Sequence, residues 1–498
     1  MPGRHPKPPP PPASIPYEGI ESGAVWTPAL TRTADTQDTL TVLYSFPQLA
    51  SDYGKPYSEA NKFVAFSAPE AAAFRPLIAL VTSYTQLNLV QNTTPGADGL
   101  ADIRIGKTVT PGADAWAYYP GTGKGGDAWF DRNDSGAVFG GKGGMDWDHL
   151  QPGGYTYTVF MHEFGHSLGL KHPFEQGGIA GAVPKAYDSI EYTVMSYDAY
   201  QTITPYDPAS TYDPAVDQRN WWADTGSNPQ TYMMLDIAAL QNMYGADFGT
   251  NNTNTTYMWS PVTGAMSING VSAFDAPGTP NIFMTIWDGG GTDTYNFSNY
   301  TLGVSIDLNP GYWVAIDYQD TDNPFQRADL LAGDGTHFAV GNIANALIIP
   351  GVNNDASHPT AGYIENAVGG AGDDVLIGNV KANMLTGGAG SDMLTGGGGN
   401  DSFVLNSLVG VDTIIDFGPG LDHLLLDDAV FTELDAAHLA NELVLDGSEA
   451  SDGNDYLLYD AGTGQLSYDA DANGSGDPIQ VALLGNHPTL TSADFLLA

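Results

Sequence analysis

The 498-residue sequence contains no cysteine. This absence excludes disulfides, thiolate metal sites and cysteine nucleophiles. Positive charge is also scarce, because 16 Lys and Arg stand against 58 Asp and Glu, which gives a formal net charge of −42. Such a charge repels nucleic acid and anionic membranes and favours divalent cations. We therefore expect no nucleic-acid partner.

Long hydrophobic runs are missing as well. No apolar stretch approaches the roughly 18 residues that a membrane-spanning helix needs, so we expect no membrane span. Residues 1–7 precede a proline run and lack the hydrophobic region of an ordinary secretory signal peptide. Hydrophobic residues nevertheless make up 42% of the chain, which is enough for more than one sizeable core.

Composition divides the chain into three regions. Residues 1–28 are rich in proline and predict an extended tail or a propeptide. Residues 29–248 mix helix and strand patterns and predict an α+β domain, whereas residues 249–498 are rich in Asn, Thr, Gly and Asp and predict an all-β domain. We expect helices at 69–87, 155–170 and 233–244, strands at 40–46, 101–106 and 113–119, and a glycine-rich loop at 121–144.

The run from His162 to His172 carries the strongest chemical signal. On a helix, His162 and His166 are four residues apart, so their imidazoles project from one face and can bind one ion. Gly169 permits a sharp turn that brings His172 round as a third nitrogen ligand. Three imidazoles with an open fourth position are typical of a catalytic zinc site. Glu163, beside the first ligand, is placed to accept a proton from water.

A methionine follows this motif at Met195, within the sequence Val194-Met-Ser-Tyr197. In a tight turn shortly after a zinc helix, its side chain can pack beneath the three imidazoles as an apolar floor. The elongated histidine motif followed by such a Met-turn defines the metzincin metalloproteases.

Four nine-residue units follow one another from Gly369. Their glycines predict tight turns that expose carbonyl oxygens, the sixth residue supplies a carboxylate, and a short strand follows. Stacked turns of this kind form a parallel β-roll with Ca²⁺ held between the turns. The sixth position holds Asp374, Asn383, Asp392 and Asp401, and the apolar eighth position holds Leu376, Leu385, Leu394 and Phe403. Since the second unit lacks the glycine and aspartate set, we expect one side of the roll to bind less calcium.

With these motifs the sequence resembles the serralysins, the metzincin branch that carries RTX calcium-binding repeats. The resemblance covers most of the chain and rests on the zinc motif, the Met-turn and the nonapeptides. It also rests on residues 235–245, 287–297 and 364–370.

The resemblance implies a secreted endopeptidase with one catalytic zinc, several structural calcium ions and broad specificity towards protein substrates. It implies that Tyr197 is an additional, displaceable zinc ligand that steadies the transition state. The calcium ligands implied by the motifs are Asp288, Gly290, Gly291, Asp293, Glu365, Gly370, Gly372, Asp374, Gly388, Gly390, Asp392 and Asp401.

The family is exported by a type I secretion apparatus that reads an uncleaved C-terminal signal, and residues 491–498 resemble such a signal. We expect an extracellular monomer whose substrate lies extended along an edge strand at 114–119. The chain departs from the family at residues 250–256, where a calcium loop is expected, and at 311–359, which is lengthened.

Other functions are weighed against this one. A calcium-binding surface or adhesion protein with a non-proteolytic metzincin domain would explain the repeats and leave the zinc helix unexplained. A pseudoprotease would usually lose Glu163 or one of the histidines, and all are present. A zinc enzyme acting on other substrates is possible in principle, but the Met-turn favours proteolysis.

Overall fold

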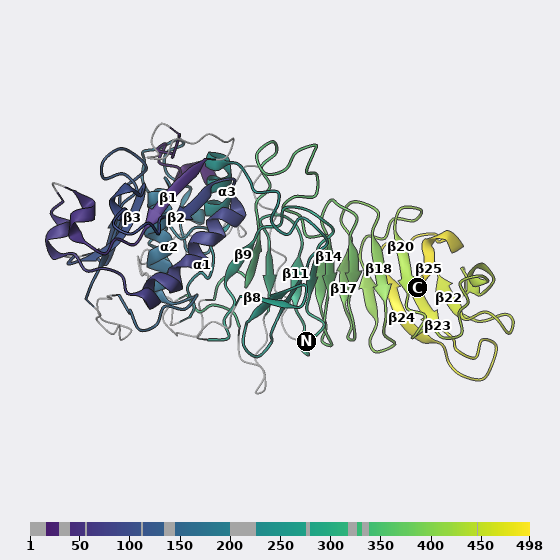
Figure 1. Cartoon of the computed structure of the whole chain (residues 1–498). Coiled ribbons are helices and arrows are strands. Elements are labelled where there is room, and N and C mark those ends of the chain that lie inside the picture. Colours follow the sequence, from purple (N-terminus) through teal and green to yellow (C-terminus); the bar gives the residue numbers. More distant parts are fainter. Residues whose placement is uncertain are drawn as a thin grey trace. The chain divides into compact units, whose positions relative to one another are not determined.

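The structure is a computed structural model of the chain (Figure 1). It describes residues 16–28, 40–54, 57–110, 113–133, 145–199, 226–274, 279–316, 326–330, 338–445 and 447–498. The chain divides into two compact units. Unit 1 is built from residues within 1–250, 277–289 and 327–362, and unit 2 from residues within 251–276, 290–326 and 363–498.

Unit 1 contains a five-stranded sheet with the strand order β2-β1-β3-β5-β4. Its strands are β1 (Thr41–Ser45), β2 (Asn88–Gln91), β3 (Ile103–Thr108), β4 (Ala115–Ala117) and β5 (Ala128–Asp131). All pairings are parallel except that of β4, which lies antiparallel to β5 at an edge of the sheet. Among the described residues, no strand pairs with the other edge of β4.

The described residues of this unit form three α-helices, namely α1 (Ala68–Tyr84), α2 (Tyr155–Ser167) and α3 (Met234–Tyr244). Ser67 caps α1 in a reciprocal capping box with Glu70, and the helix continues through Pro76. The ring of Phe74 on α1 stacks on Phe160 of α2 at 3.8 Å. This contact ties the helix that carries the histidine motif to the hydrophobic core.

Short 3-10 turns connect the elements. In unit 1 they are η1 (Tyr17–Ile20), η2 (Ala50–Tyr53), η3 (Glu59–Lys62), η4 (Asp98–Leu100) and η5 (Lys185–Tyr187), and in unit 2 they are η6 (Leu439–Asn441) and η7 (Ser492–Asp494).

Residues 16–28 are folded into unit 1, although the proline-rich composition predicts a tail up to residue 28. The backbone N–H of Lys171 donates to the carbonyl of Ile20 at 2.7 Å, and Ser22 donates to Gly169 at 2.9 Å. The indole of Trp26, which is buried, donates to the carbonyl of Ser167 at 2.9 Å. This segment thus pairs with the chain that follows α2, and only residues 1–15 of the predicted tail lie outside the described residues.

Two later segments also complete unit 1, so the unit is not confined to the predicted range 29–248. Strands β9 (Met284–Ile286) and β13 (Ile343–Asn345) pair in parallel with each other. The buried side chain of Asn353 donates to Gln241 of α3 at 2.6 Å. Residues 338–359, the described end of the stretch that the sequence left without a function, are therefore structural partners of α3.

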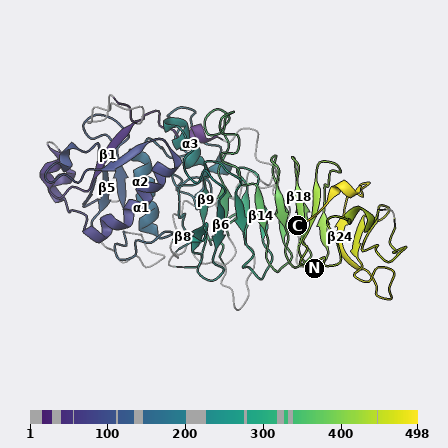
Figure 2. The same ribbon diagram turned by 45° about the vertical axis from the view of Figure 1, so that its right-hand side comes forward.

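Unit 2 forms two sheets of mainly parallel strands that follow one another along the chain (Figure 2). One has the order β25-β20-β18-β16-β14-β10-β6-β7-β8, and the other includes β21-β22-β23-β24-β19-β17-β15-β11-β12. The strands of the first are β6 (Thr256–Trp259), β7 (Met266–Ile268), β8 (Val271–Phe274), β10 (Thr294–Asn296), β14 (Asn366–Val368), β16 (Met384–Thr386), β18 (Ser402–Leu405), β20 (His423–Leu426) and β25 (Phe495–Leu497). Those of the second are β11 (Ser305–Asp307), β12 (Trp313–Ala315), β15 (Val375–Ile377), β17 (Met393–Thr395), β19 (Asp412–Ile414), β21 (Leu443–Val444), β22 (Leu457–Asp460), β23 (Gln465–Tyr468) and β24 (Ile479–Leu484).

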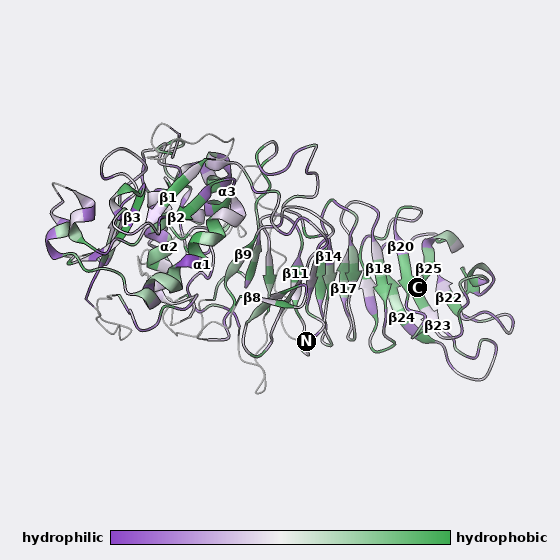
Figure 3. Cartoon of the chain, in the orientation of Figure 1, coloured by the Kyte–Doolittle hydropathy of each residue, from purple (hydrophilic) through white to green (hydrophobic). Residues whose placement is uncertain are grey.

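The nonapeptides build this arrangement, because each strand pairs with the strand two repeats further along. Leu376 lies beside Leu394, and Leu385 lies beside Phe403. All four side chains are fully buried, as the eighth position of the repeat predicts. Hydrophobic colouring falls mainly on strands and helices, and the connecting loops are largely polar (Figure 3). The predicted parallel β-roll is confirmed.

Two local features differ from the expectations. The glycine-rich loop expected at 121–144 contains β5, because four residues between the glycine clusters suffice for a buried strand, and residues 134–144 lie outside the described part. Helix α2 ends at Ser167, before Gly169 with its φ of 106°. At the end of the chain, β25 pairs in parallel with β20. None of the helices in the described ranges is long and apolar enough to cross a membrane.

Candidate active site

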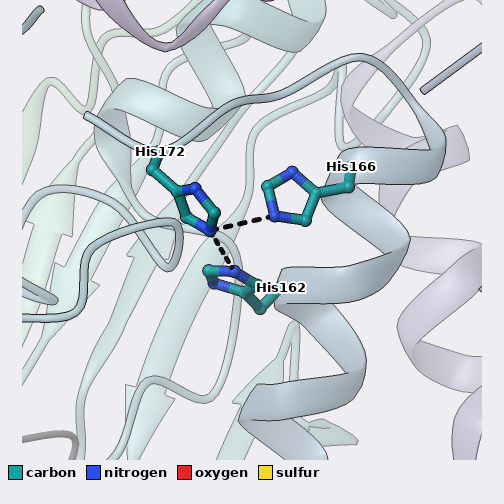
Figure 4. A group of neighbouring side chains, drawn as sticks. All are labelled: His162, His166 and His172. Atoms are coloured by element: carbon teal, nitrogen blue, oxygen red, sulfur yellow. Dashed lines mark hydrogen bonds between the residues drawn. The ribbon is translucent and has the colours of Figure 1, made fainter. Parts of the chain in front are cut away.

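The three histidines of the motif converge on one point (Figure 4). The Nε2 atom of His172 lies 3.2 Å from Nε2 of His162 and 3.2 Å from Nε2 of His166. His162 and His166 come from the same face of α2, and His172 returns from the loop after Gly169. A substituent at Gly169 would lie 2.2 Å from the carbonyl oxygen of Ala24, so glycine is required there by space as well as by φ.

The other nitrogen of each ring is held by an acceptor. Nδ1 of His162 lies 2.8 Å from the carbonyl oxygen of Val194, and Nδ1 of His166 lies 2.7 Å from that of Leu170. A carbonyl can only accept, so both Nδ1 atoms carry the proton and both Nε2 atoms present a lone pair. Nδ1 of His172 lies 2.8 Å from a carboxylate oxygen of Glu175.

Burial keeps these rings neutral. It lowers the pKa of His166 to about 3, and neighbouring His172 adds to the effect. The pKa of His162 is held well below its usual value by burial and then by the other two histidines, and burial also lowers the pKa of His172. Neutral imidazole is the form that binds a metal ion.

The arrangement fits a zinc ion. A tetrahedral zinc with Zn–N distances of about 2.0–2.1 Å requires its nitrogen ligands to lie about 3.4 Å apart. The separations of 3.2 Å match that requirement, and three converging lone pairs repel one another unless a cation lies between them. Among the described residues, the three histidines form the one cluster of potential metal-binding side chains whose ligand atoms lie this close together.

Glu163 lies beside the triad on α2, and it is buried. Burial raises the pKa of its carboxyl group to about 8, and a hydrogen bond from the backbone of Ala117 acts in the opposite direction. Its Oε2 atom is buried and has no hydrogen-bond partner in the described part of the chain. A carboxylate oxygen so placed can accept a proton from water close to the three histidines.

Tyr197 contacts two of the histidine rings, and Met195 packs against the helix that carries the motif. The ring of Tyr197 lies 4.5 Å from that of His172 and 5.7 Å from that of His162, measured between centroids. Met195 is fully buried, and its sulfur would lie 2.8 Å from a Cβ atom at Gly165. The absence of a side chain at Gly165 therefore lets the methionine pack directly against α2.

The turn that carries Met195 is held by an aspartate that the sequence motifs do not single out. Asp236 of α3 is fully buried and accepts hydrogen bonds from the hydroxyl of Thr193 at 2.6 Å and from the backbone of Val194 at 2.8 Å. It also caps its own helix through the N–H of Met233. In the sequence, the sign that could have pointed to Asp236 is the presence of an acidic residue in the first turn of a helix.

The calcium candidates before the repeats are buried acidic side chains and glycines with unusual backbone. Glu365 accepts a hydrogen bond from the N–H of Asp293 at 2.8 Å, and its other oxygen, Oε1, is buried with no hydrogen-bond partner among the described residues. Gly290 and Gly291 have φ angles of 129° and 149°. Asp288 is buried in unit 1.

The candidates in the repeats form two ladders. On one side, Asp392 accepts from the N–H of Asp374 at 2.8 Å, and Asp412 accepts from Asp392 at 3.2 Å. On the other side, Asp401 accepts from Asn383 at 2.9 Å, and Asp422 accepts from Asp401. Asp412 and Asp422 lie beyond the last nonapeptide, where irregular spacing hid them from sequence reasoning.

Glycines in the repeats leave room for these carboxylates and carbonyls. A Cβ atom at Gly387 would lie 2.1 Å from Oδ2 of Asp392. Gly388 and Gly390 have positive φ angles of 103° and 132°, and a side chain at either would strike the carbonyl of Gly370 or Gly372. The predicted ligands Gly370, Gly372, Gly388 and Gly390 thus lie in successive turns of the roll.

Three protein families match successive parts of the sequence. Residues 110–204 match the family described as Matrixin, and residues 246–317 match the serralysin C-terminal family of peptidases M10. Residues 368–403 match the RTX calcium-binding nonapeptide repeat. These matches confirm the predicted fold class, an α+β metzincin domain followed by a β-roll, and the expectation of zinc and calcium as cofactors.

Known relatives extend the match over most of the chain. Metalloprotease AprA of Pseudomonas entomophila is 30% identical over 79% of this chain and 74% of its own length. Metallopeptidase AprA of Pseudomonas marginalis is 27% identical over 71% of this chain, and Serralysin C of Dickeya chrysanthemi is 28% identical over 53%. The matched part covers 63% and 43% of those two proteins, which is less than two thirds of either. The chain belongs to the serralysin family of RTX-bearing metzincins.

Proposed function

We propose that this protein is a secreted, zinc-dependent endopeptidase that hydrolyses peptide bonds of extracellular proteins with broad specificity and is stabilised by calcium. The observation that carries the proposal is the convergence of three neutral imidazoles beside Glu163, a buried carboxyl group with an acceptor oxygen that has no hydrogen-bond partner among the described residues. A metal-binding site with an adjacent base is the arrangement that metal-assisted hydrolysis requires.

In this proposal His162, His166 and His172 hold the zinc ion, and Tyr197 is a further, displaceable ligand. A zinc ion bound there lowers the pKa of a coordinated water to about 7 and polarises the carbonyl of the substrate. The chain contributes a rigid set of donors, since each ring is fixed through its Nδ1 atom.

Glu163 is the general base and then the general acid. Its carboxylate takes the proton from the attacking water and delivers it to the amine of the leaving peptide. Burial raises the pKa of this group to about 8, which strengthens it as a base. The positive charge of a nearby cation would draw the pKa down again, so the group can be charged before the reaction and can release its proton after it.

Tyr197 donates a hydrogen bond to the oxygen of the scissile carbonyl as negative charge develops there. Its ring lies against those of His172 and Phe174, at 4.5 and 5.2 Å between centroids, which places the ring beside the third histidine. Met195 supplies the apolar support beneath them.

The substrate binds as an added strand along β4, whose outer edge pairs with no strand of the described part of the chain. Ala117 at the end of β4 bonds to Glu163, and Tyr119 lies edge-on to the ring of His166 at 5.6 Å. Backbone pairing with this strand would place a peptide bond over the histidines while tolerating many side chains, which accounts for broad specificity.

Calcium ions stabilise the roll in this proposal. The side-chain and carbonyl ligands carried over from the motifs are Asp288, Gly290, Gly291, Asp293, Glu365, Gly370, Gly372, Asp374, Gly388, Gly390, Asp392 and Asp401. Carboxylate and carbonyl oxygens are the ligands that Ca²⁺ prefers. A type I secretion apparatus would export the chain through its C-terminal residues, and the exported protein would act as a monomer.

Cleavage of casein tests the proposal. The purified protein with zinc and calcium should degrade casein, and Glu163→Ala should lower the rate by a factor of about 10²–10⁴ or more while zinc still binds in a 1:1 ratio. Glu449→Ala, which alters an exposed glutamate of unit 2, should leave the rate unchanged. Equal rates for Glu163→Ala and the wild-type protein would contradict the mechanism.

A further inference from the structure

The three histidines differ in what holds them. His162 and His166 are anchored by backbone carbonyls, which no substitution removes. His172 is anchored by a side chain, the carboxylate of Glu175, at 2.8 Å. His172 also lies on a loop, whereas the other two lie on α2. The third ring is therefore the one whose orientation depends on a replaceable group.

Glu175 is itself fixed in place. Its backbone N–H donates to the carbonyl of His172 at 3.2 Å, which closes a turn between the two residues. Its backbone carbonyl accepts from the ammonium group of Lys171 at 2.8 Å. Lys171 is buried and also donates to the carbonyl of Gly181 at 2.9 Å. A charge held among backbone carbonyls in this way pins the loop that carries both Glu175 and His172.

The second carboxylate oxygen of Glu175 faces the chain just after β4, the strand along which the substrate is proposed to lie. It accepts from the hydroxyl of Tyr119 at 3.4 Å, two residues after the end of β4. Tyr119 in turn lies edge-on to the ring of His166 at 5.6 Å. Glu175 thus joins the loop of the third histidine to the end of the strand along which the substrate is proposed to lie.

We propose that Glu175 is a positioning residue that sets the zinc affinity of the site by holding His172 with its Nδ1 atom protonated and its Nε2 lone pair directed at the metal. The inference rests on the proposed zinc site, and it concerns binding of the metal rather than cleavage. Carboxylates that accept from a ligating histidine fix its tautomer and ring orientation, and their loss typically lowers metal affinity by roughly 10- to 100-fold.

Zinc affinity, measured by competition with a chromogenic chelator in the presence of calcium, tests this role. Glu175→Ala should weaken zinc binding by roughly 10- to 100-fold. Glu175→Gln should restore most of the affinity, because the amide oxygen accepts the same hydrogen bond from Nδ1. The matched control is Asp435→Ala, which removes a carboxylate lying 2.7 Å from Nδ1 of His438 at an exposed position in unit 2. It should leave zinc affinity unchanged.

Two further measurements separate positioning from general stability. The visible spectrum of the cobalt-substituted protein should change in Glu175→Ala and return in Glu175→Gln, because it reports the geometry of the ligands. The melting temperature of the zinc-free protein should be the same for both variants. A Glu175→Ala protein that binds zinc as tightly as Asp435→Ala would overturn the inference, and so would an affinity loss that Glu175→Gln does not repair.

The outcomes also separate this inference from the proposed function. If the wild-type protein binds zinc but does not cleave casein, and Glu175→Ala binds zinc more weakly than the wild type, the positioning role is sustained and the peptidase activity is rejected. If the wild-type protein cleaves casein and Glu175→Ala binds zinc as tightly as the wild type, the positioning role alone is rejected.

Discussion

The two metal-binding regions of this molecule are prepared for their ions in opposite ways. At the histidine triad, burial lowers the pKa values of the rings, so they are neutral without metal and each has a hydrogen-bond partner at Nδ1. In the roll, Asp374 and its neighbour Asp392 are buried acids, and burial and the neighbouring carboxylate raise the pKa of Asp374 to about 7. The zinc site is thus built from neutral rings, whereas the calcium sites of the roll are built from acidic groups whose charged forms repel one another until a cation binds.

Removal of each metal in turn should show the difference between the two metal-binding regions most clearly. Stripping zinc with phenanthroline in excess calcium should leave the far-ultraviolet circular dichroism and melting temperature of the protein nearly unchanged. Stripping calcium with zinc present should abolish the β signal of unit 2, because each calcium site occupied at 100 times its dissociation constant contributes about 2.7 kcal/mol. A similar loss of structure on zinc removal would show that the triad is not formed in advance.

The pH dependence of the calcium-free protein should reveal the buried acids directly. The pKa of Asp374 is raised to about 7, and burial is also the main cause that raises the pKa of Glu365 to about 7 and of Asp401 to about 6. Groups whose pKa is higher in the folded state than in the unfolded state stabilise the fold when they are protonated. A tenfold difference between the two acid dissociation constants corresponds to about 1.4 kcal/mol.

The stability of calcium-free unit 2 should therefore be greatest near pH 4, where these acids are largely protonated in both states, and should fall as the pH rises from there to about 7. With saturating calcium the trend should reverse, since the cation binds the charged form. Urea unfolding of calcium-stripped protein at a series of pH values measures both curves. A calcium-free stability that rises between pH 5 and 7 would contradict the assignment.

Substitution of Asp236 should destabilise unit 1, which carries the histidine triad. Asp236→Ala leaves the hydroxyl of Thr193 and the N–H groups of Val194 and Met233 buried without their acceptor. Lost hydrogen bonds of this kind destabilise unit 1 by about 3 kcal/mol or more. Thermal unfolding in saturating calcium measures the effect, and Glu449→Ala, at an exposed position of unit 2, is the control.

A glycine substitution should give the smallest effect. Gly387→Ala places a Cβ atom 2.1 Å from Oδ2 of Asp392 and should cost roughly 1–3 kcal/mol by overpacking. At Gly398 the nearest atom to a new Cβ is 3.7 Å away, so Gly398→Ala should lie within about 0.5 kcal/mol of the wild type. Equal stability of the two variants would show that the close fit around Asp392 carries no cost.

The sequence predicted the parts of the molecule that follow from local periodicity. The spacing of His162, His166 and His172 predicted the convergence of their rings, and the nonapeptide period predicted the inward positions from Leu376 to Phe403. Both patterns depend on the fixed geometry of a helix or a repeating turn.

Contacts between distant residues were not predictable in the same way. Asp236 reaches the Met-turn across more than 40 residues of chain, and Asp412 extends a ladder beyond the regular repeats. Glu175 lies close to its histidine in sequence, yet nothing in the spacing shows that its carboxylate turns back onto Nδ1. Such contacts depend on tertiary packing, which a single sequence does not display.

The interleaving of segments in unit 1 has a consequence for the order of events during synthesis. Strands β9 and β13 can join this unit only after residues 284–286 and 343–345 have been made, which follow the last residue of α3, Tyr244, in the chain. A nascent chain of about 250 residues therefore holds all three histidines but lacks part of the scaffold around them. Unit 1 is complete only after residues that follow the first strands of the roll have been made. Its assembly therefore depends on translation of the second half of the chain.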